Sequence, residues 1–194
     1  RILSQLVLRV GDQRPSRLSS GVSQDNVFFT CHSTNRPLPP MGGRSAPAGV
    51  LHLVRRRFRW DRRLFERIRV VNHCVEDVLL PLSVDYAADV VDVFQVRGMA
   101  RAQMGTLHTP SANGRRVLFA YDGLDGRRRT GCLSFSEAPA VMTGHRAEFM
   151  LSLPRGRAAV PACYAAHGAA RAGRVVGVSP RRQLEAACGG IDGS

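Results

Sequence analysis

The clearest alternation of apolar and polar residues in this chain lies in residues 51–72. Apolar side chains and arginines take turns there with a period of two, which is the period of a half-buried strand and not of a helix. The polar segment 61–63 interrupts the alternation, which then resumes, so we predict a β-hairpin. In the first strand one face carries Val54, Phe58 and Trp60, and the other carries Arg55, Arg57 and Arg59. In the second strand one face carries Leu64, Ile68 and Val70, and the other carries Phe65, Arg67, Arg69 and Val71.

The arginines of this hairpin need a counter-charge. Like charges on neighbouring strands repel each other, so carboxylates or an acidic partner must neutralise them. Asp61 and Glu66 are the local candidates. The face is either solvated, which is the usual state of a charge run, or a surface on which Arg57, Arg59 and Glu66 dock another domain.

Short strand-like runs with turn signals follow one another along the rest of the chain. A stretch rich in proline and glycine, residues 36–49, predicts a long surface loop. No helical apolar period persists before residue 160, so we predict an all-β fold, an antiparallel β-sandwich spanning residues 1–165. Residues 166–194 are rich in alanine, glycine and arginine, and we predict a weakly ordered or helical tail there. The other predicted strand-like runs are 6–10, 27–31, 78–86, 117–121, 130–135, 149–153 and 158–163.

Composition narrows the classes of function. The 194 residues suffice for one domain, and 44% hydrophobic residues indicate a globular chain. A net charge of +13 is compatible with binding to a phosphate backbone. However, all 28 basic residues are arginine, a bias that we attribute to a GC-rich coding sequence, and they are scattered along the chain. A basic nucleic-acid-binding domain is therefore the weakest alternative, and we expect no nucleic-acid partner.

The cysteines and the ends of the chain bear on localisation. Five widely spaced cysteines without a Cys-x-x-Cys motif fit a reducing cytoplasm. The only Cys/His neighbours are adjacent in sequence, and such neighbours rarely bind one ion together, so we expect no metal and no cofactor. No run has the length of a membrane span, so we expect no membrane partner. The chain starts at Arg1, within a strand-like pattern and without methionine, and we expect its natural beginning to be missing.

Several separated blocks resemble one known family. They are similar to the N-terminal domain of bacterial glycogen debranching enzyme homologues, of the amylo-α-1,6-glucosidase type, and occur in the same order. The similarity covers roughly residues 1–163, and agreement of ordered blocks argues against chance. The blocks are Arg57–Asp61, Leu64–Asn72, Asp89–Gly98, Tyr121–Gly126 and Arg146–Phe149.

This resemblance implies a supersandwich-like β-sandwich that precedes a toroid of paired helices carrying the glycoside hydrolase site. The toroid is not in this chain. We therefore expect a non-catalytic accessory domain in glycogen or α-glucan metabolism, with the helical catalytic domain as its partner. The alternative is a stand-alone carbohydrate-binding module. Gln95 departs from the glutamate that is usual in the family block, and residues beyond Gly168 match nothing in the family.

Asp89 and Asp92 are the candidate carboxylates for catalysis. Glycoside hydrolysis needs two carboxyl groups that flank the scissile bond. Asp89 and Asp92 lie three residues apart, so a regular strand would place them on opposite faces unless a bend intervened. An ion pair between Asp92 and Arg97, or between Asp92 and a hairpin arginine, is the favoured interpretation. We therefore assign no catalytic residue.

Four aromatic residues are candidates for stacking on sugar rings. The side chains of Phe58, Trp60, Tyr86 and Phe94 have faces that can cover a pyranose ring. Alternating aromatics in strands more often fill a core, so we expect Trp60 to be buried. If the chain does contact α-glucan, the candidate residues are Trp60, Asp92 and Arg97.

Overall fold

The computed structural model describes residues 3–41, 44–61, 63–90, 97–98 and 103–169, and all of its regular elements are strands. The smaller sheet contains β1 (Leu3–Val10), β8 (Val78–Ala88), β13 (Val141–Met142) and β14 (Arg146–Leu153). A separate pair consists of β4 (Leu38–Met41) and β5 (Arg44–Ala46). The larger sheet contains β2 (Ser16–Val22), β3 (Phe28–Thr34), β6 (Leu51–Trp60), β7 (Arg63–Asn72), β9 (Thr106–Leu107), β10 (Ser111–Asn113), β11 (Arg116–Asp122), β12 (Arg128–Phe135) and β15 (Ala158–Ala169).

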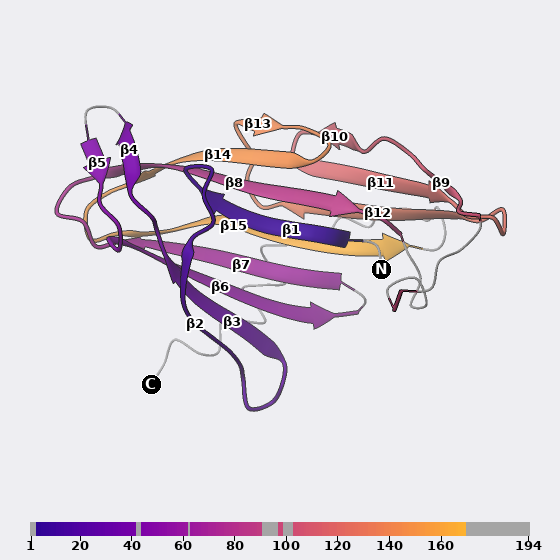
Figure 1. Ribbon diagram of the computed structural model, residues 1–194, viewed down its shortest axis with the longest axis horizontal. Helices are drawn as coiled ribbons and strands as arrows, with labels where there is room; N and C mark the ends of the chain where they lie inside the picture. The colour runs from indigo at the N-terminus through magenta and orange to yellow at the C-terminus, as the bar shows by residue number, and fades with distance from the viewer. Residues whose placement is uncertain (1–2, 42–43, 62, 91–96, 99–102, 170–194) are drawn as a thin grey trace.

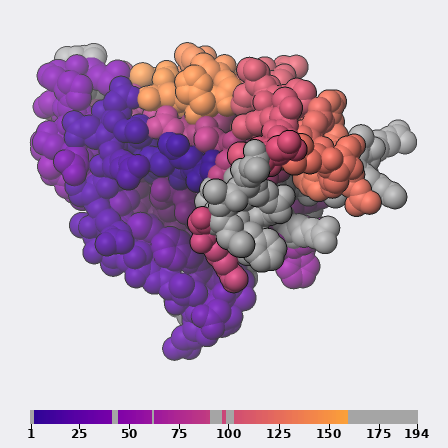
Figure 2. Space-filling view, turned by 45° about the vertical axis from the view of Figure 1, so that its right-hand side comes forward, coloured from indigo at the N-terminus to yellow at the C-terminus, as the bar shows by residue number. Residues whose placement is uncertain are grey.

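Two antiparallel sheets of unequal width face each other (Figure 1). The four-stranded sheet has the order β1-β8-β14-β13. The nine-stranded sheet has the order β10-β11-β12-β15-β7-β6-β3-β2, and β9 pairs with β11. The predicted antiparallel β-sandwich is therefore confirmed. Because one sheet is wider, β6, β3 and β2 continue below the smaller sheet, where indigo and purple atoms form the projecting lower end of the molecule in Figure 2.

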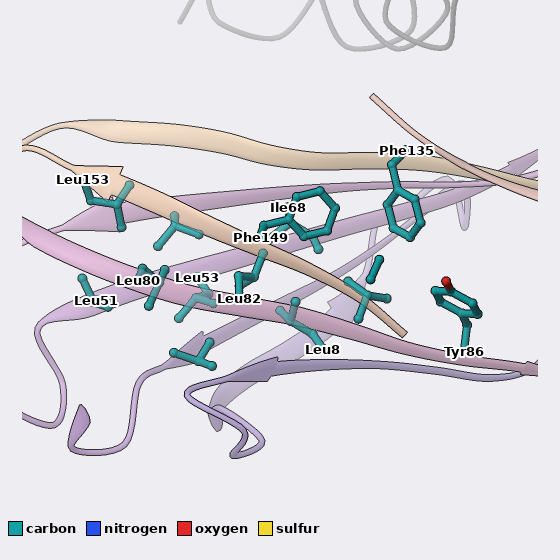
Figure 3. Packing of buried hydrophobic residues seen from close by; sticks show 14 of the residues in the cluster. Leu8, Leu51, Leu53, Ile68, Leu80, Leu82, Tyr86, Phe135, Phe149 and Leu153 are labelled. Carbon is teal, nitrogen blue, oxygen red and sulfur yellow. The ribbon is translucent and has the colours of Figure 1, made fainter. Parts of the chain in front are cut away.

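Apolar side chains from both sheets form one core between them (Figure 3). In β8 the alternation predicted from the sequence is the observed one, because every second residue from Val78 to Tyr86 is buried. Phe149 and Leu153 of β14 continue the core beside β8. The larger sheet contributes Leu51, Leu53, Ile68, Val70, Val117, Phe119, Leu133 and Phe135.

The predicted hairpin exists as β6 and β7, but the arginine face of β6, which was expected to meet solvent or a partner, lies on the interior side of the sandwich. Leu51 and Leu53 are fully buried, so the odd-numbered residues of β6 face the sandwich interior. Arg55, Arg57 and Arg59 share this face by the alternation of a strand, whereas Val54, Phe58 and Trp60 face the opposite way. The pairing of β6 with β7 agrees with this orientation, since Leu53 lies opposite the buried Val70 and Arg55 lies opposite the buried Ile68.

Two other expectations differ from the structure. Within the predicted loop 36–49, the segments β4 and β5 pair with each other, and Leu38 and Ala46 are buried there. β15 continues to Ala169, beyond the boundary expected at residue 165, because it is paired on both sides by β12 and β7. Its alanine-rich sequence carries little apolar alternation, so neighbouring strands define it. Residues 170–194 lie outside the described part of the chain.

A buried asparagine fastens the end of the hairpin opposite its turn. Asn72, the last residue of β7, has no exposed surface. Its Nδ2 donates hydrogen bonds to the carbonyl oxygens of Glu76 and Leu153, both at 2.9 Å, and its Oδ1 accepts one from the amide of Cys74 at 2.8 Å. All these bonds use the side-chain amide, so Asn72 joins β7, the turn after it and β14.

Candidate functional site

Two hairpin arginines share one buried carboxylate. Glu66 of β7 lies directly opposite Arg57 of β6, and its side chain is fully buried. Its Oε2 accepts from Arg57 Nε at 2.6 Å, and its Oε1 accepts from Arg55 Nε. The arginine side chains are 17% exposed for Arg55 and 29% for Arg57. We call these three residues the Arg55–Glu66–Arg57 cluster.

This cluster resolves the repulsion that the sequence pattern implied. A carboxylate without exposed surface is stable as an ion only when charged or hydrogen-bonding groups replace its water. The two guanidinium groups do this for Glu66, and Glu66 in turn holds two like charges side by side on β6. Glu66 and Arg57 are therefore brought together as the sequence suggested, but as a structural cluster on the interior side.

The hairpin tip presents a tryptophan to solvent. Trp60 is the last residue of β6, pairs with Arg63 and is 72% exposed. The expectation that Trp60 is buried is wrong, because its face of β6 points away from the core and the strand ends there. Asp61 follows with a φ of 44° and reverses the chain. Arg59, next to Trp60, is exposed on the other face of the strand.

The outward face of the hairpin carries a second aromatic group. Phe58 stacks on Phe65 with ring centroids 4.9 Å apart, and Phe28 of β3 lies 5.5 Å from Phe58. Arg56 covers the Phe28 ring at 5.1 Å, a cation–π contact. These contacts hold Phe58 beside its neighbours on the outward face of the sheet, so Phe58 does not stand out as an isolated sugar platform.

The remaining sugar-binding and carboxylate candidates that the structure describes are Tyr86, Asp89 and Arg97. Tyr86 is a core residue, and its hydroxyl donates to the carbonyl oxygen of Thr143 at 2.7 Å. Val90 has a φ of 47°, so the chain bends directly after Asp89, as a shared carboxylate site would require. Arg97 is exposed. Asp92 and Phe94 lie outside the described residues, and so does the predicted ion pair of Asp92.

Three histidines form a row on the outward face of the larger sheet. His32 Nδ1 of β3 lies 3.1 Å from His52 Nε2 of β6, and the His73 ring is centred 6.4 Å from that of His52. Burial lowers the pKa of His52, and the charges of His32, His73 and Arg69 lower it further. No local sequence pattern predicts this contact, since its partners are 20 residues apart. Among the residues that are described, no three His, Cys, Asp or Glu side chains form a metal-binding group.

We expect acid to weaken the fold through His52. Its folded pKa lies below the ordinary value of 6.5, so the unfolded chain binds the proton more readily. The contribution of His52 to the free energy of unfolding is therefore constant above pH 6.5 and falls as the pH drops from 6.5 toward its lowered folded pKa. Urea unfolding measured between about pH 7.5 and 5.5 should show this loss, and His52→Gln should reduce it. An identical pH dependence in His52→Gln would contradict the prediction.

The comparisons with known proteins decide the family. The model for the N-terminal domain of (some) glycogen debranching enzymes matches residues 1–162. The chain belongs to this family. The resemblance of the hairpin and the other sequence blocks is therefore confirmed. A comparison with curated proteins found no match.

A search of solved structures adds a distant similarity for this glycogen debranching enzyme N-terminal domain. A polysaccharide lyase superposes with a TM-score of 0.38 at 14% sequence identity. The alignment covers 94% of this chain and 27% of the lyase chain. The chain thus spans about a quarter of the length of that structure. Separately, the described residues contain no helix long and apolar enough to cross a membrane.

Proposed function

We propose that this domain is a non-catalytic accessory part of a glycogen-debranching-type glycoside hydrolase and docks on a helical-toroid catalytic domain. The observation that supports the proposal is the end of the hairpin, where Arg59 and Trp60 are exposed beside the half-buried Arg57. Trp60 is 72% exposed although tryptophan is a large apolar side chain. Tryptophan and arginine are the residues most enriched at the energetic centres of protein interfaces.

The Arg55–Glu66–Arg57 cluster gives this hairpin end a rigid base. Arg57 is fixed by Glu66, so its side chain is already ordered and loses little entropy when a partner binds. Arg59 and Trp60 extend beyond this base on opposite faces of the strand. A partner that encloses the tip would contact both.

The free thiols of Cys31, Cys74 and Cys132 are compatible with a reducing compartment, and we propose that the domain acts in the cytoplasm.

The double variant Arg59→Ser, Trp60→Ala should weaken docking without unfolding the domain. Exposed substitutions of this kind change stability by about 0.5 kcal/mol or less. Calorimetric titration with the separately produced helical domain of a debranching enzyme from this family measures the affinity. We expect a loss of at least about tenfold, the cost of truncating two hot-spot residues. Circular dichroism checks the fold.

The matched control is Leu124→Ala combined with Arg155→Ser. Leu124 is 63% exposed and Arg155 is also exposed, and both lie outside the β6–β7 hairpin. This control should bind like the parent chain. Equal affinity of parent and hairpin variant would remove the hairpin end from the interface, and absence of any binding by the parent would contradict the docking function.

A carbohydrate-binding module is the second candidate, because the exposed Trp60 ring is available to stack on a sugar. Co-sedimentation with glycogen separates the two functions. If the domain is an accessory docking domain, the chain should remain in the supernatant. Retention that Trp60→Ala abolishes and Leu124→Ala does not would favour the binding module instead.

We also expect that this chain alone does not hydrolyse α-1,6-linked glucan. The carboxylates of Glu66 and Asp85 are held in ion pairs, Glu66 by two arginines and Asp85 by Arg9 and Arg146, which supports this expectation. The measurement is release of glucose or oligosaccharide from a branched limit dextrin. Asp89→Asn and Asp92→Asn serve as controls for contaminating activity. Turnover that both substitutions abolish would overturn the accessory role.

A further inference from the structure

The contact between His32 and His52 is unusual in its chemistry. Two imidazole nitrogens at 3.1 Å can form a hydrogen bond only if one carries a proton and the other is unprotonated. At least one ring must therefore be neutral. The rings are nearly parallel, with planes 14° apart and centroids separated by 5.2 Å. Both side chains are half-buried, so they lie at the sheet surface and remain accessible to small ions.

The same distance suits two nitrogens bound to one metal ion. With metal–imidazole bonds of about 2.0–2.1 Å, nitrogens 3.1 Å apart subtend an angle of about 100° at the ion. Tetrahedral and octahedral ions place neighbouring ligands at about 109° and 90°, so this angle lies between them. An ion bound by both nitrogens would lie beside the line that joins them, so binding requires each ring to turn about its Cβ–Cγ bond.

Metal ions bind the unprotonated nitrogen of imidazole, and the contact between the two rings already requires one such nitrogen. Arg69 lies on the same face and repels a cation, which limits the affinity. The exposed side of the pair leaves room for water to complete the coordination.

We propose that His32 and His52 form a two-histidine site for a divalent transition-metal ion, such as Zn²⁺ or Ni²⁺, that ties β3 to β6. Imidazole is a preferred ligand of these ions, whereas Mg²⁺ prefers oxygen ligands. The residues come from neighbouring strands and pair diagonally, since His32 lies opposite Val54 and His52 opposite Thr34. An ion held by both therefore bridges the strand pair that joins β2 and β3 to the rest of the sheet.

Thermal unfolding of the full chain, prepared without a histidine tag, tests the site. An ion that binds only the folded chain raises the melting temperature. We expect ZnCl₂ or NiCl₂ to raise it at pH 7.5 and MgCl₂ to leave it unchanged. Calorimetric titration should give one ion per chain. Either His32→Ala or His52→Ala should lower the affinity by at least about tenfold, because each removes half of the protein ligands.

His145→Ala is the matched control, since His145 is exposed and belongs to the smaller sheet's side of the molecule. It should bind metal like the parent chain. Circular dichroism of each variant without metal shows whether it folds, and His32→Gln and His52→Gln replace any alanine variant that does not. Equal affinity in the parent and both pair variants, or an equal loss in His145→Ala, would overturn the proposal. A calorimetric titration of the parent chain that shows no binding of one ion per chain would overturn it as well.

Discussion

Glu66→Ala is expected to destabilise the domain by about 3–5 kcal/mol, the cost of removing one partner from a buried ion pair. The carboxylate has no exposed surface and accepts hydrogen bonds from Arg55 and Arg57. Its loss leaves two neighbouring guanidinium groups on one strand face without this counter-charge. Urea unfolding at pH 7 measures the change. Glu137→Ala, at an exposed carboxylate, is the control and should change stability by about 0.5 kcal/mol or less.

A combined substitution separates the charge from the packing. If the cost arises from unpaired charge, replacing all three members by apolar residues, as in Arg55→Met, Arg57→Met, Glu66→Leu, should recover most of the lost stability. Apolar replacement of a complete buried ion cluster is often neutral or stabilising, unlike removal of one partner. A loss below about 1 kcal/mol in Glu66→Ala would show that the cluster does not stabilise the hairpin.

The second large effect is expected at Asn72. Asn72→Ala removes three hydrogen bonds and leaves the carbonyl oxygen of Leu153 without its amide partner in a buried position. Each unsatisfied buried group costs about 1–3 kcal/mol, so we expect a total loss of about 3 kcal/mol. Urea unfolding again gives the value. Asn113→Ala, at an exposed asparagine of β10, is the control. Equal stability of the two variants would contradict the prediction.

Regular alternation was the part of the sequence that predicted structure best. In β8 the buried residues were identified correctly because Val78, Leu80, Leu82, Val84 and Tyr86 are apolar at every second position. In β6 the same rule gave a hairpin but the wrong face. The apolar residues that define the interior side are Leu51 and Leu53, and the same side continues as arginine. Alternation thus shows that two faces exist, whereas the core contacts decide which face is inside.

The site could be predicted only where its residues are close in sequence. Glu66 could be predicted as a counter-charge for the hairpin arginines, because the hairpin turn brings it opposite Arg57. The contact between His32 and His52 depends on the pairing of β3 with β6, and the intervening segment contains the separate pair β4–β5. No local pattern specifies that register. The exposure of Trp60 follows from the end of the strand, which the sequence placed correctly without indicating the direction of the side chain.

The position of β15 has a consequence for how the chain folds. This last described strand lies between β12 and β7, so the two parts of the larger sheet meet only through it. During synthesis β7 is complete long before residues 158–169 leave the ribosome. Until then the edge of β7 that pairs with β15 has no partner strand. Such non-local pairing slows folding and leaves a strand edge open to association with other chains. Folding of the larger sheet is therefore completed only after residues 158–169 have been synthesised.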